Sequence, residues 1–521
     1  MTDLPSAWAN AKFSDFGTWV GGGTPSKANP RFWGGPIPWV SPKDMKTKII
    51  RETIDGITEE AVGNSAAKLV PAGSVLIVTR SGILAHTLPI AITAVESTLN
   101  QDLKALTLPD GISADYVAWG MRAFEQRILD KCRKGGTTVH SIEMPRLASF
   151  ELPIAPTNEQ RRIVEKIEAL FDEIDAGVQS LQKARATLGH YRQSLLKSAF
   201  EGRLTADWRA QNADKLEAPE TLLARIQTEG DTRYKAALDD WQTALTKWRA
   251  DGEQGKKPAK PKRPKEPARI EVDVLPELPK SWLWATLDEI VSGQPRSMQS
   301  GPFGSSLKHS EFRDRGILVV GIDNVRNGSF SMGSENRISP EKYSELMKYT
   351  ARPRDLLITV MASLGRSCVI PESLETAIIT KHVYRITIEH NLLDVHFYNY
   401  LVQAEWVTRK AMLQNAFGQT RPGINSSVLR SLPVPILSKK EQTEIVRILD
   451  ARLDAANAME TEIDAALTRA EALRQSILKK AFSGQLVPQD PTDEPALVLL
   501  ERIKTERAKA PKRPRTRKVR A

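Results

Sequence analysis

The sequence predicts an α+β protein in which two globular mixed α/β domains alternate with two long helices that pair as an antiparallel coiled coil. Three observations lead to this fold class. A 46-residue stretch occurs twice, the segments around it recur in the same order, and both copies have the apolar spacing of helices that pack on one or two partners. We therefore expect an internal pseudo-twofold repeat of domain, helix, domain and helix.

The repeated stretch occupies residues 159–204 and 441–486. At a constant offset of 282 residues, 17 of the 46 aligned positions are identical. The ends are the most alike, with EQ opening both copies and RQSLLKSAF matching RQSILKKAF. Thr157 has the spacing of a capping-box hydroxyl, and Gly202 and Gly484 follow the last apolar turns. These signals predict that each copy forms one continuous helix. About 42 residues at ~1.5 Å each make a helix of roughly 60 Å, which is too long for an ordinary core helix.

Apolar residues in both copies follow one another at alternating spacings of four and three, the heptad pattern of a coiled coil, although Arg452 interrupts the second copy. The nearest available partner for each helix is the other copy. The alternative is that the two helices pack separately on globular domains. We expect an interface formed by Ile163, Ile167, Leu170, Ile174, Leu181, Leu188, Leu195, Ile445, Leu449, Met459, Ile463, Leu473 and Ile477.

The repeat divides the chain into six segments. They are a first globular domain (1–156), a first long helix (157–202), a helical and basic Pro-rich linker (203–275), a second globular domain (276–437), a second long helix (438–484), and a helix with a basic disordered tail (485–521). Five pairs of short segments correspond in sequence order. They are 4–16 with 278–290, 37–45 with 317–325, 70–78 with 352–360, 135–156 with 417–437, and 222–229 with 499–506.

The net charge of +11 lies mainly in two Pro-interleaved stretches, 252–269 and 509–520, and the remainder of the chain carries about −1. We expect both stretches to be disordered. Net charge alone therefore does not establish a DNA-reading surface. Nothing in the sequence is apolar enough to span a membrane, there is no signal-peptide pattern, and only two cysteines occur, so we expect a cytoplasmic protein. Trp208, Trp241 and Trp248 in the linker could stack on bases, but their helical spacing favours docking within the protein.

An antiparallel pair of long helices would act as a spacer between two similar domains that differ in sequence. Equivalent groove faces of DNA recur about every 34 Å, so such a spacer suits the reading of two short half-sites separated by a gap. Because the domains differ from each other, we expect the two half-sites to differ as well.

Several motifs resemble the specificity subunits of type I restriction-modification enzymes. They are ELPKSWLW, GPFGSSLK, LPVPILSKKEQ and RQSILKKAFSGQLVPQD, together with the paired organisation of the whole chain. The resemblance implies that the globular domains are target-recognition domains for double-stranded DNA. It also implies that the long helices fix the half-site spacing and hold two modification (methyltransferase) subunits. Methylation of adenine N6 and ATP-driven translocation with cleavage would then belong to the modification and restriction partners, which use S-adenosylmethionine, ATP and Mg²⁺.

A search for catalytic motifs in this chain gives only weak matches. Asn29-Pro30-Arg31-Phe32 is one residue away from an amino-methyltransferase loop, but no cofactor-binding sheet precedes it. The Gly21–Lys27 run lacks the spacing of a phosphate-binding loop, and the histidines and cysteines lack zinc-ligand spacing. We therefore predict a non-catalytic subunit that binds no cofactor or metal of its own.

DNA contacts are then expected on loops where small residues let the backbone approach and polar side chains reach base edges or phosphates. For each candidate, a phosphate contact or a plain loop role is the alternative to base reading. The first domain offers Thr24, Ser26, Lys27, Arg80, Ser81, Lys134, Thr137 and Thr138, and the second offers Gln294, Arg296, Ser305, Ser306, Lys308, Arg366, Gln419, Thr420 and Arg421.

A function of another class is also compatible with this architecture. The chain could be a two-headed coiled-coil scaffold whose domains bind proteins rather than DNA. The pattern of divergence favours DNA recognition, because the helices are alike while the domains differ. A scaffold that used its domains to bind two copies of one partner should have kept the domains similar.

Overall fold

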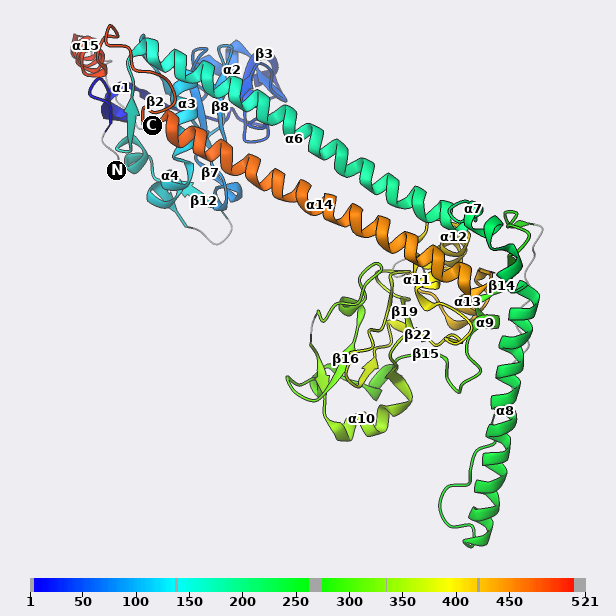
Figure 1. Ribbon diagram of the computed structural model, residues 1–521. Helices are drawn as coiled ribbons and strands as arrows, with labels where there is room; N and C mark the ends of the chain where they lie inside the picture. The colour runs from blue at the N-terminus through cyan, green and yellow to red at the C-terminus, as the bar shows by residue number, and fades with distance from the viewer. Residues whose placement is uncertain (1–3, 136–138, 262–273, 334, 419–421, 510–521) are drawn as a thin grey trace. The chain divides into compact units, whose positions relative to one another are not determined.

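The computed structural model describes residues 4–135, 139–261, 274–333, 335–418 and 422–509. It divides into two compact units, with unit 1 made of Met1–Lys183 and Ile463–Ala521 and unit 2 made of Ala184–Glu462. The two predicted long helices are present as α6 (Thr157–Phe200) and α14 (Lys439–Ala481), and each contributes one part to each unit (Figure 1).

The globular part of unit 1 contains a five-stranded sheet of order β2-β10-β6-β8-β4 and three smaller sheets, β5-β3-β9, β11-β12-β7 and β1-β13. The strands are β1 (Ala9–Lys12), β2 (Thr18–Gly21), β3 (Trp33–Val40), β4 (Ile49–Ile50), β5 (Asp55–Ile57), β6 (Val75–Val78), β7 (Arg80–Ser81), β8 (Ile90–Thr93), β9 (Thr98–Leu99), β10 (Leu103–Thr107), β11 (Arg133–Lys134), β12 (His140–Ile142) and β13 (Glu151–Ile154). The helices besides α6 and α14 are α1 (Phe13–Phe16), α2 (Glu59–Asn64), α3 (Ala114–Ala123), α4 (Glu125–Cys132), α5 (Met144–Ala148) and α15 (Ala496–Lys509).

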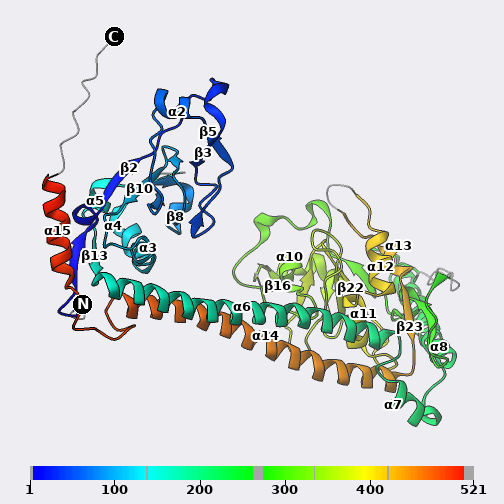
Figure 2. The same ribbon diagram turned by 90° about the horizontal axis from the view of Figure 1, so that it is seen from above.

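The main core of unit 1 joins the globular domain to the long helices. Ile163 of α6 and Ile477 of α14 are buried in the same cluster as Leu152 of β13 and Leu499 of α15. α15 lies beside α1, where the Ala496 N–H donates to a backbone carbonyl of the N-terminal segment (Figure 2). The beginning of α6 and the end of α14 are thus fixed on one core.

Unit 2 repeats this plan with a sheet of order β15-β22-β19-β20, a second sheet of order β17-β16-β21-β18, and the pair β14-β23. Its strands are β14 (Leu283–Thr286), β15 (Met298–Ser300), β16 (Ile317–Val320), β17 (Arg337–Ile338), β18 (Thr350–Ala351), β19 (Leu356–Thr359), β20 (Ser367–Val369), β21 (Ala377–Ile379), β22 (Val383–Ile386) and β23 (Pro433–Ile436). Its helices besides α6 and α14 are α7 (Ala206–Gln211), α8 (Pro219–Ala250), α9 (Leu287–Ile290), α10 (Pro340–Leu346), α11 (Val395–Gln403), α12 (Val407–Gln414) and α13 (Ser426–Arg430).

In unit 2 the opposite ends of the long helices meet. Leu195 and Phe200 of α6 are buried in one cluster with Ile445 and Leu449 of α14 and with Leu222 of α8. Since the start of α6 packs with the end of α14 in unit 1, and the end of α6 packs with the start of α14 in unit 2, the helices pair antiparallel. The predicted intramolecular pair is confirmed, and the alternative of separate packing is wrong.

The helix interface differs in part from the expected residues. Seven of the expected positions are buried, namely Ile163, Ile167, Leu195, Ile445, Leu449, Ile463 and Ile477. Four more are half-buried, namely Leu170, Ile174, Leu181 and Leu188. Met459 and Leu473 are 58% and 51% exposed, so the structure does not place them in the interface.

Charged residues take the places expected for Met459 and Leu473. The heptad spacing in the structure runs through the next residue in each case, Glu460 and Arg474. Glu460 Oε2 accepts from Arg192 Nη1 of α6 at 2.7 Å within unit 2, and Arg474 forms an ion pair with Asp175 of α6 within unit 1. Ion pairs therefore replace apolar contacts at these two interface positions.

The EQ dipeptide that opens each copy anchors the helix to its domain. Gln160 accepts from the Ser113 N–H and donates to the Ala155 carbonyl, both at 2.9 Å. Gln442 makes the same two kinds of hydrogen bond in unit 2, at 2.8 and 2.9 Å. Thr157, expected as a capping hydroxyl, is instead the first helical residue and donates to the Gly111 carbonyl. The terminal glycines, Gly202 and Gly484, both have the predicted left-handed conformation with φ of 73°.

The glutamate of each dipeptide is a buried acceptor. Glu159 accepts from Trp8 Nε1 at 2.9 Å, and Glu441 accepts from Trp282 Nε1 at 3.0 Å. Burial raises the pKa of Glu159, and the hydrogen bonds from Trp8 and a glutamine oppose that rise. Glu441 also accepts from Arg209 Nε at 2.7 Å. Each glutamate thus joins its long helix to the start of its domain.

Replacement of this acceptor gives the first prediction. Glu441→Ala leaves the guanidinium of Arg209 and the indole of Trp282 without their buried acceptor, so we expect a loss of ~3–5 kcal/mol of unfolding free energy. Lys440→Ala, at the neighbouring exposed position, should change it by less than about 0.5 kcal/mol. Denaturant titration of the full chain, with hydrogen exchange to assign the loss to unit 2, measures both. Equal losses in the two variants would contradict the anchoring role.

The correspondences predicted between the two halves are largely confirmed, with one correction. Segments 4–16 and 278–290 both form a strand followed by one helical turn, and 222–229 and 499–506 are both helical with buried leucines. The match of 70–78 to 352–360 is wrong by one residue. Leu103 pairs with Val78 where Val383 pairs with Thr359, so the strands align at an offset of 281. A gapless comparison cannot detect a one-residue slip in such apolar runs.

The linker is more ordered than its composition predicts over the part that the structure describes. α8 extends to Ala250, and residues 252–261 turn back along it (Figure 1). Trp241 Nε1 donates to the Pro258 carbonyl at 3.1 Å, and Trp248 Nε1 donates to the Gly255 carbonyl at 3.3 Å. The tryptophans therefore dock the chain on itself, as predicted.

Candidate nucleic-acid interface

In unit 1 the structure brings together candidate residues that are far apart in the sequence. β7, which contains Arg80, pairs with β12, and β12 pairs with β11, which contains Lys134. Ser141 stands directly opposite both Arg80 and Lys134 in this register. Residues opposite one another in antiparallel strands point to the same face, so these three side chains lie in one row. Arg80 and Lys134 are exposed there.

A hollow of about 410 Å³ adjoins this sheet. Its lining residues are Pro42, Arg80, Ser81, Gly82, Gln101, Asp102 and Val139. Thr24 reaches the same place, because its hydroxyl donates to Gln101 Oε1. The hollow and its rim thus combine cationic, hydroxyl, amide and carboxylate groups, which is the mixture needed to contact both phosphates and base edges.

The glycine run before Thr24 explains how the loop comes so close. A Cβ on Gly22 would lie 1.8 Å from the Asn100 carbonyl oxygen, and one on Gly23 would lie 2.2 Å from the Ala66 carbonyl oxygen. Only glycine permits this approach of two backbones. Ser26 and Lys27 follow on the exposed part of the loop. Thr137 and Thr138 lie outside the described residues.

Unit 2 has an equivalent glycine loop after β15. A Cβ on Gly301 would lie 2.2 Å from the Thr380 carbonyl carbon, just as Gly22 would meet Asn100. Ser306 and Lys308 are exposed on this loop, and the Lys308 N–H donates to Glu311 Oε2 at 2.6 Å. The position of Ser305 is on the same turn, Gly304–Ser306. Arg366 lies between β19 and β20, with its N–H donating to Thr359 Oγ1 at 3.0 Å.

Gln294 and Arg296 are not brought together with the other candidates of unit 2. They precede β15, whereas the glycine loop follows it, so they lie at the opposite end of that strand. The Arg296 carbonyl accepts from Arg385 Nη2 at 2.6 Å, and Gln294 Oε1 accepts from Arg352 at 2.8 Å. The Arg296 backbone thus holds a buried arginine, whereas Gln294 contacts the half-buried Arg352. Gln419, Thr420 and Arg421 lie outside the described residues.

The buried arginine forms an ion pair in the core of unit 2. Arg385 Nε lies 3.4 Å from Asp355 Oδ2, and the two side chains are 1% and 0% exposed. Burial raises the pKa of Asp355 and lowers the pKa of Arg385, while the attraction between the two charges opposes both shifts. The pair fixes the end of the sheet that carries Gln294 and Arg296, so it serves the fold rather than the exposed loops.

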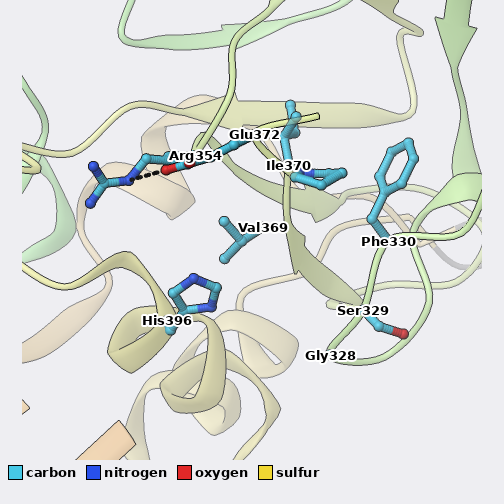
Figure 3. A pocket seen from close by; sticks show the side chains of 9 residues that line it. Gly328, Ser329, Phe330, Arg354, Val369, Ile370, Glu372 and His396 are labelled. Carbon is cyan, nitrogen blue, oxygen red and sulfur yellow. Dashed lines mark ion pairs between the residues drawn. The ribbon is translucent and has the colours of Figure 1, made fainter. Parts of the chain in front are cut away.

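A second hollow, of about 400 Å³, lies at the far end of the β19–β20 pair from Arg366. Val369, Phe330 and His396 line it, and Arg354 Nε approaches Glu372 Oε1 at 3.9 Å at its edge (Figure 3). None of the sequence-predicted candidates that the structure describes lines this hollow. It therefore is not part of the candidate interface.

Sequence reasoning missed the turn that directly precedes β10 in unit 1 and β22 in unit 2. In unit 1 this turn carries Gln101 and Asp102, which line the first hollow. In unit 2 the equivalent turn carries Lys381 and His382, directly before β22. The signal in the sequence was a polar pair before an apolar strand, which is too common to be informative without the register.

Two negative findings restrict the chemistry. Among the described residues, no group of three or more histidine, cysteine, aspartate or glutamate side chains could hold a metal ion. Over that same part of the chain, no helix has the length and apolar character needed to cross a bilayer.

The fold and the loop surfaces define a two-domain protein with long paired helices. The family model described as "Type I restriction modification DNA specificity domain" matches residues 5–183 and 307–469. The chain therefore belongs to the family of type I restriction-modification DNA specificity subunits.

Individual relatives agree with this family. The chain is 42% identical over 188 residues to the Type I restriction enzyme EcoR124I/EcoR124II specificity subunit of Escherichia coli, a match that covers 35% of this chain and 46% of that protein. It is 24% identical over 379 residues to the EcoBI specificity subunit of Escherichia coli, covering 71% and 67%. A chain from a structure of a type I R-M system shares the fold with a TM-score of 0.62 at 16% identity, covering 93% of this chain and 100% of that one.

Proposed function

We propose that each globular domain reads one half of a bipartite, asymmetric target in double-stranded DNA. The long helices bind two modification (methyltransferase) subunits and set the gap between the half-sites, and restriction and translocation subunits join that complex. The candidate contacts are the glycine loops with Thr24, Ser26, Lys27, Ser305, Ser306 and Lys308, and the residues at or between strand ends, Arg80, Ser81, Lys134 and Arg366. Thr137, Thr138, Gln419, Thr420 and Arg421 complete the set.

One observation carries this proposal. The two domains share strand register, glycine loops and helix anchors, but their exposed loop side chains differ. In unit 1, Arg80 lines the hollow and Lys134 lies in the same row of side chains, whereas Lys308 and Arg366 occupy the loops of unit 2. Different loop side chains on the same domain fold are expected when the two domains read different DNA sequences. Similar long helices are expected when both bind the same kind of partner subunit. A protein scaffold for two copies of one partner has no need of this divergence.

Methylation mapping tests the proposal. The full chain is expressed in cells together with its modification partner, and modified adenines are located in the DNA. We expect one sequence made of two short, different half-sites with a constant gap. Methylation that ignores sequence, or a continuous single site, would contradict the reading of one half-site by each domain.

The second prediction concerns catalysis, which we assign to the partner subunits. The purified chain, incubated with S-adenosylmethionine, ATP, Mg²⁺ and target DNA, should transfer no methyl groups, hydrolyse no ATP and cut no DNA. In the same assay, addition of the modification partner should start methyl transfer. Turnover that persists in the chain alone after contaminants are removed would overturn this assignment. The proposal also places the protein in the cytoplasm with its DNA target.

A further inference from the structure

The turn before β10 in unit 1 and the turn before β22 in unit 2 occupy the same structural position in their domains. The Thr79 N–H donates to the Asp102 carbonyl at 2.7 Å, and the Val360 N–H donates to the His382 carbonyl at 2.9 Å. The residues on either side also correspond, since Leu103 pairs with Val78 as Val383 pairs with Thr359. Asp102 and His382 are therefore equivalent, and so are the residues before them, Gln101 and Lys381.

The glycine loops show the same equivalence for the residues just before each dipeptide. Gly22 crosses over the backbone of Asn100, and Gly301 crosses over the backbone of Thr380. In both domains the first residue of the dipeptide is exposed and the second is half-buried. The two dipeptides thus occupy equivalent positions in their domains. Each lies between the glycine loop and the loop that follows the neighbouring strand, β6 in unit 1 and β19 in unit 2.

In unit 1 the dipeptide faces the candidate interface directly. Gln101 and Asp102 line the hollow with Arg80. Gln101 Nε2 lies 3.4 Å from Asp102 Oδ2, and Thr24 donates to Gln101 Oε1. The hydroxyl and the carboxylate therefore orient the amide. The Gln101 side chain is therefore held in one orientation before DNA binds, although an exposed glutamine otherwise rotates freely.

In unit 2 the same point has the opposite charge. Lys381 is exposed and has no hydrogen-bond or ion-pair partner among the residues that the structure describes. Burial, and then the neighbouring Lys381 charge, lowers the pKa of His382. This shift favours the neutral form of the imidazole, which offers one donor and one acceptor. One dipeptide is acceptor-rich and the other is donor-rich.

The charge of Asp102 bears on its role in a DNA interface. Phosphates repel a carboxylate, so an acidic side chain gains nothing from the DNA backbone and can gain only from base edges. Carboxylates accept from the exocyclic amino group of cytosine, and glutamine binds the adenine edge with both of its polar atoms. Lysine and histidine donors instead suit the N7 and O6 acceptors of guanine.

We propose that Gln101–Asp102 and Lys381–His382 are specificity-determining residues that read base edges in the two half-sites. The first dipeptide selects an adenine or cytosine, and the second selects a guanine. The inference rests on the proposed reading of one half-site by each domain, and it adds residues and a base preference to that function.

Exchange of the dipeptides tests the inference. The double variant Gln101→Lys with Asp102→His is expressed as the full chain with its modification partner, and methylated sites are mapped. We expect one or two positions of one half-site to change, with the preference between the old and new base shifting by about 10- to 100-fold. The other half-site and the gap should stay as in the wild type. Lys381→Gln with His382→Asp should change the other half-site in the same way.

Controls separate this outcome from other causes. Asp110→Asn removes an exposed charge beyond the opposite end of β10 and should leave the preference unchanged. Thermal denaturation shows whether each variant is folded, and Gln101→Ala supplies a milder change should the double variant unfold. A uniform weakening at all sequences would assign the dipeptide to the DNA backbone and overturn the inference, as would an unchanged preference in folded variants. Absence of a bipartite site for the wild type would instead refute the proposed function itself.

Discussion

Exchange of Gly17–Ser149 for the same segment of another specificity subunit is expected to replace one half-site completely and leave the other half-site and the gap unchanged. The segment contains the glycine loop, β7, β11, β12 and the Gln101–Asp102 turn, which together form the candidate interface of unit 1. It leaves Trp8, Glu159 and Gln160 in place, and the hydrogen bonds of the long helix to Gly111 and Ser113 involve only backbone atoms of the exchanged segment. Methylation mapping of the hybrid with its modification partner measures both half-sites at once.

The boundaries of this exchange follow from the contacts of the N-terminal residues. The sequence alone suggests a cut at the start of the long helix, but Trp8 donates to Glu159, and the Ala496 N–H donates to the Ala7 carbonyl. A cut at residue 156 would exchange Trp8 and Ala7 along with the reading loops and would weaken these contacts. Cutting after Phe16 and before Phe150 preserves them.

The hybrid has a matched control and a clear contradicting outcome. A second hybrid that exchanges only β1 and α1, residues 9–16, should keep both wild-type half-sites, because β1 pairs with β13 and α1 packs against α15, away from the loop surface. If the Gly17–Ser149 hybrid altered both half-sites, recognition would be shared between the domains. The model of one domain for each half-site would then be wrong.

The long helices could be predicted from sequence because their signals are local. EQ at the start, a glycine after the end and a heptad spacing all lie within 46 residues, and the same signals occur twice. The expected interface failed at Met459 and Leu473 for an equally local reason. The sequence pattern marks interface positions by hydrophobicity alone, whereas Glu460 and Arg474 occupy two of these positions and pair with charges on α6. An ion pair across two helices cannot be recognised until the partner helix and its register are known.

The candidate interface could be predicted only in part. Arg80 and Lys134 were found because they stand beside small residues in loops, and the structure places them in one row through β12. Gln294 and Arg296 have the same local character, but they lie at the other end of β15. The Gln101–Asp102 turn was missed because nothing near it in the sequence is unusual. Sequence shows which residues are on loops, and strand register decides which loops share a face.

Insertion of two residues after Ala176 of α6 is expected to abolish assembly of an active complex. Two residues rotate the rest of the helix by about 200° and add ~3 Å. Ile174 and the residues before it are packed on the core of unit 1, and Leu195 and Phe200 are buried in the core of unit 2. Because α14 is also packed in both units, α6 cannot rotate as a whole to compensate. A rotation of this size therefore exposes one of the two buried faces of α6 to solvent. Methylation by the complex should then be lost.

Insertion of four residues at the same place should have a different outcome. Four residues rotate the helix by about 400°, which is close to one full turn, and lengthen it by ~6 Å, so the apolar stripe is nearly kept. Because ~6 Å corresponds to nearly two base-pair steps of ~3.4 Å, the half-sites should stay the same while the gap grows by about one or two base pairs. Methylation mapping distinguishes this result from simple loss of activity.

A control insertion shows whether the position of the added residues matters. The same four residues placed after Gly252, in the exposed turn that follows α8, lengthen neither long helix and should leave the gap unchanged. A helical spacer requires the two-residue and four-residue insertions in α6 to have different outcomes. A flexible connection would tolerate both insertions equally. A gap that ignores the four-residue insertion, or normal methylation by the two-residue variant, would place the control of spacing outside these helices, with the modification subunits as its source.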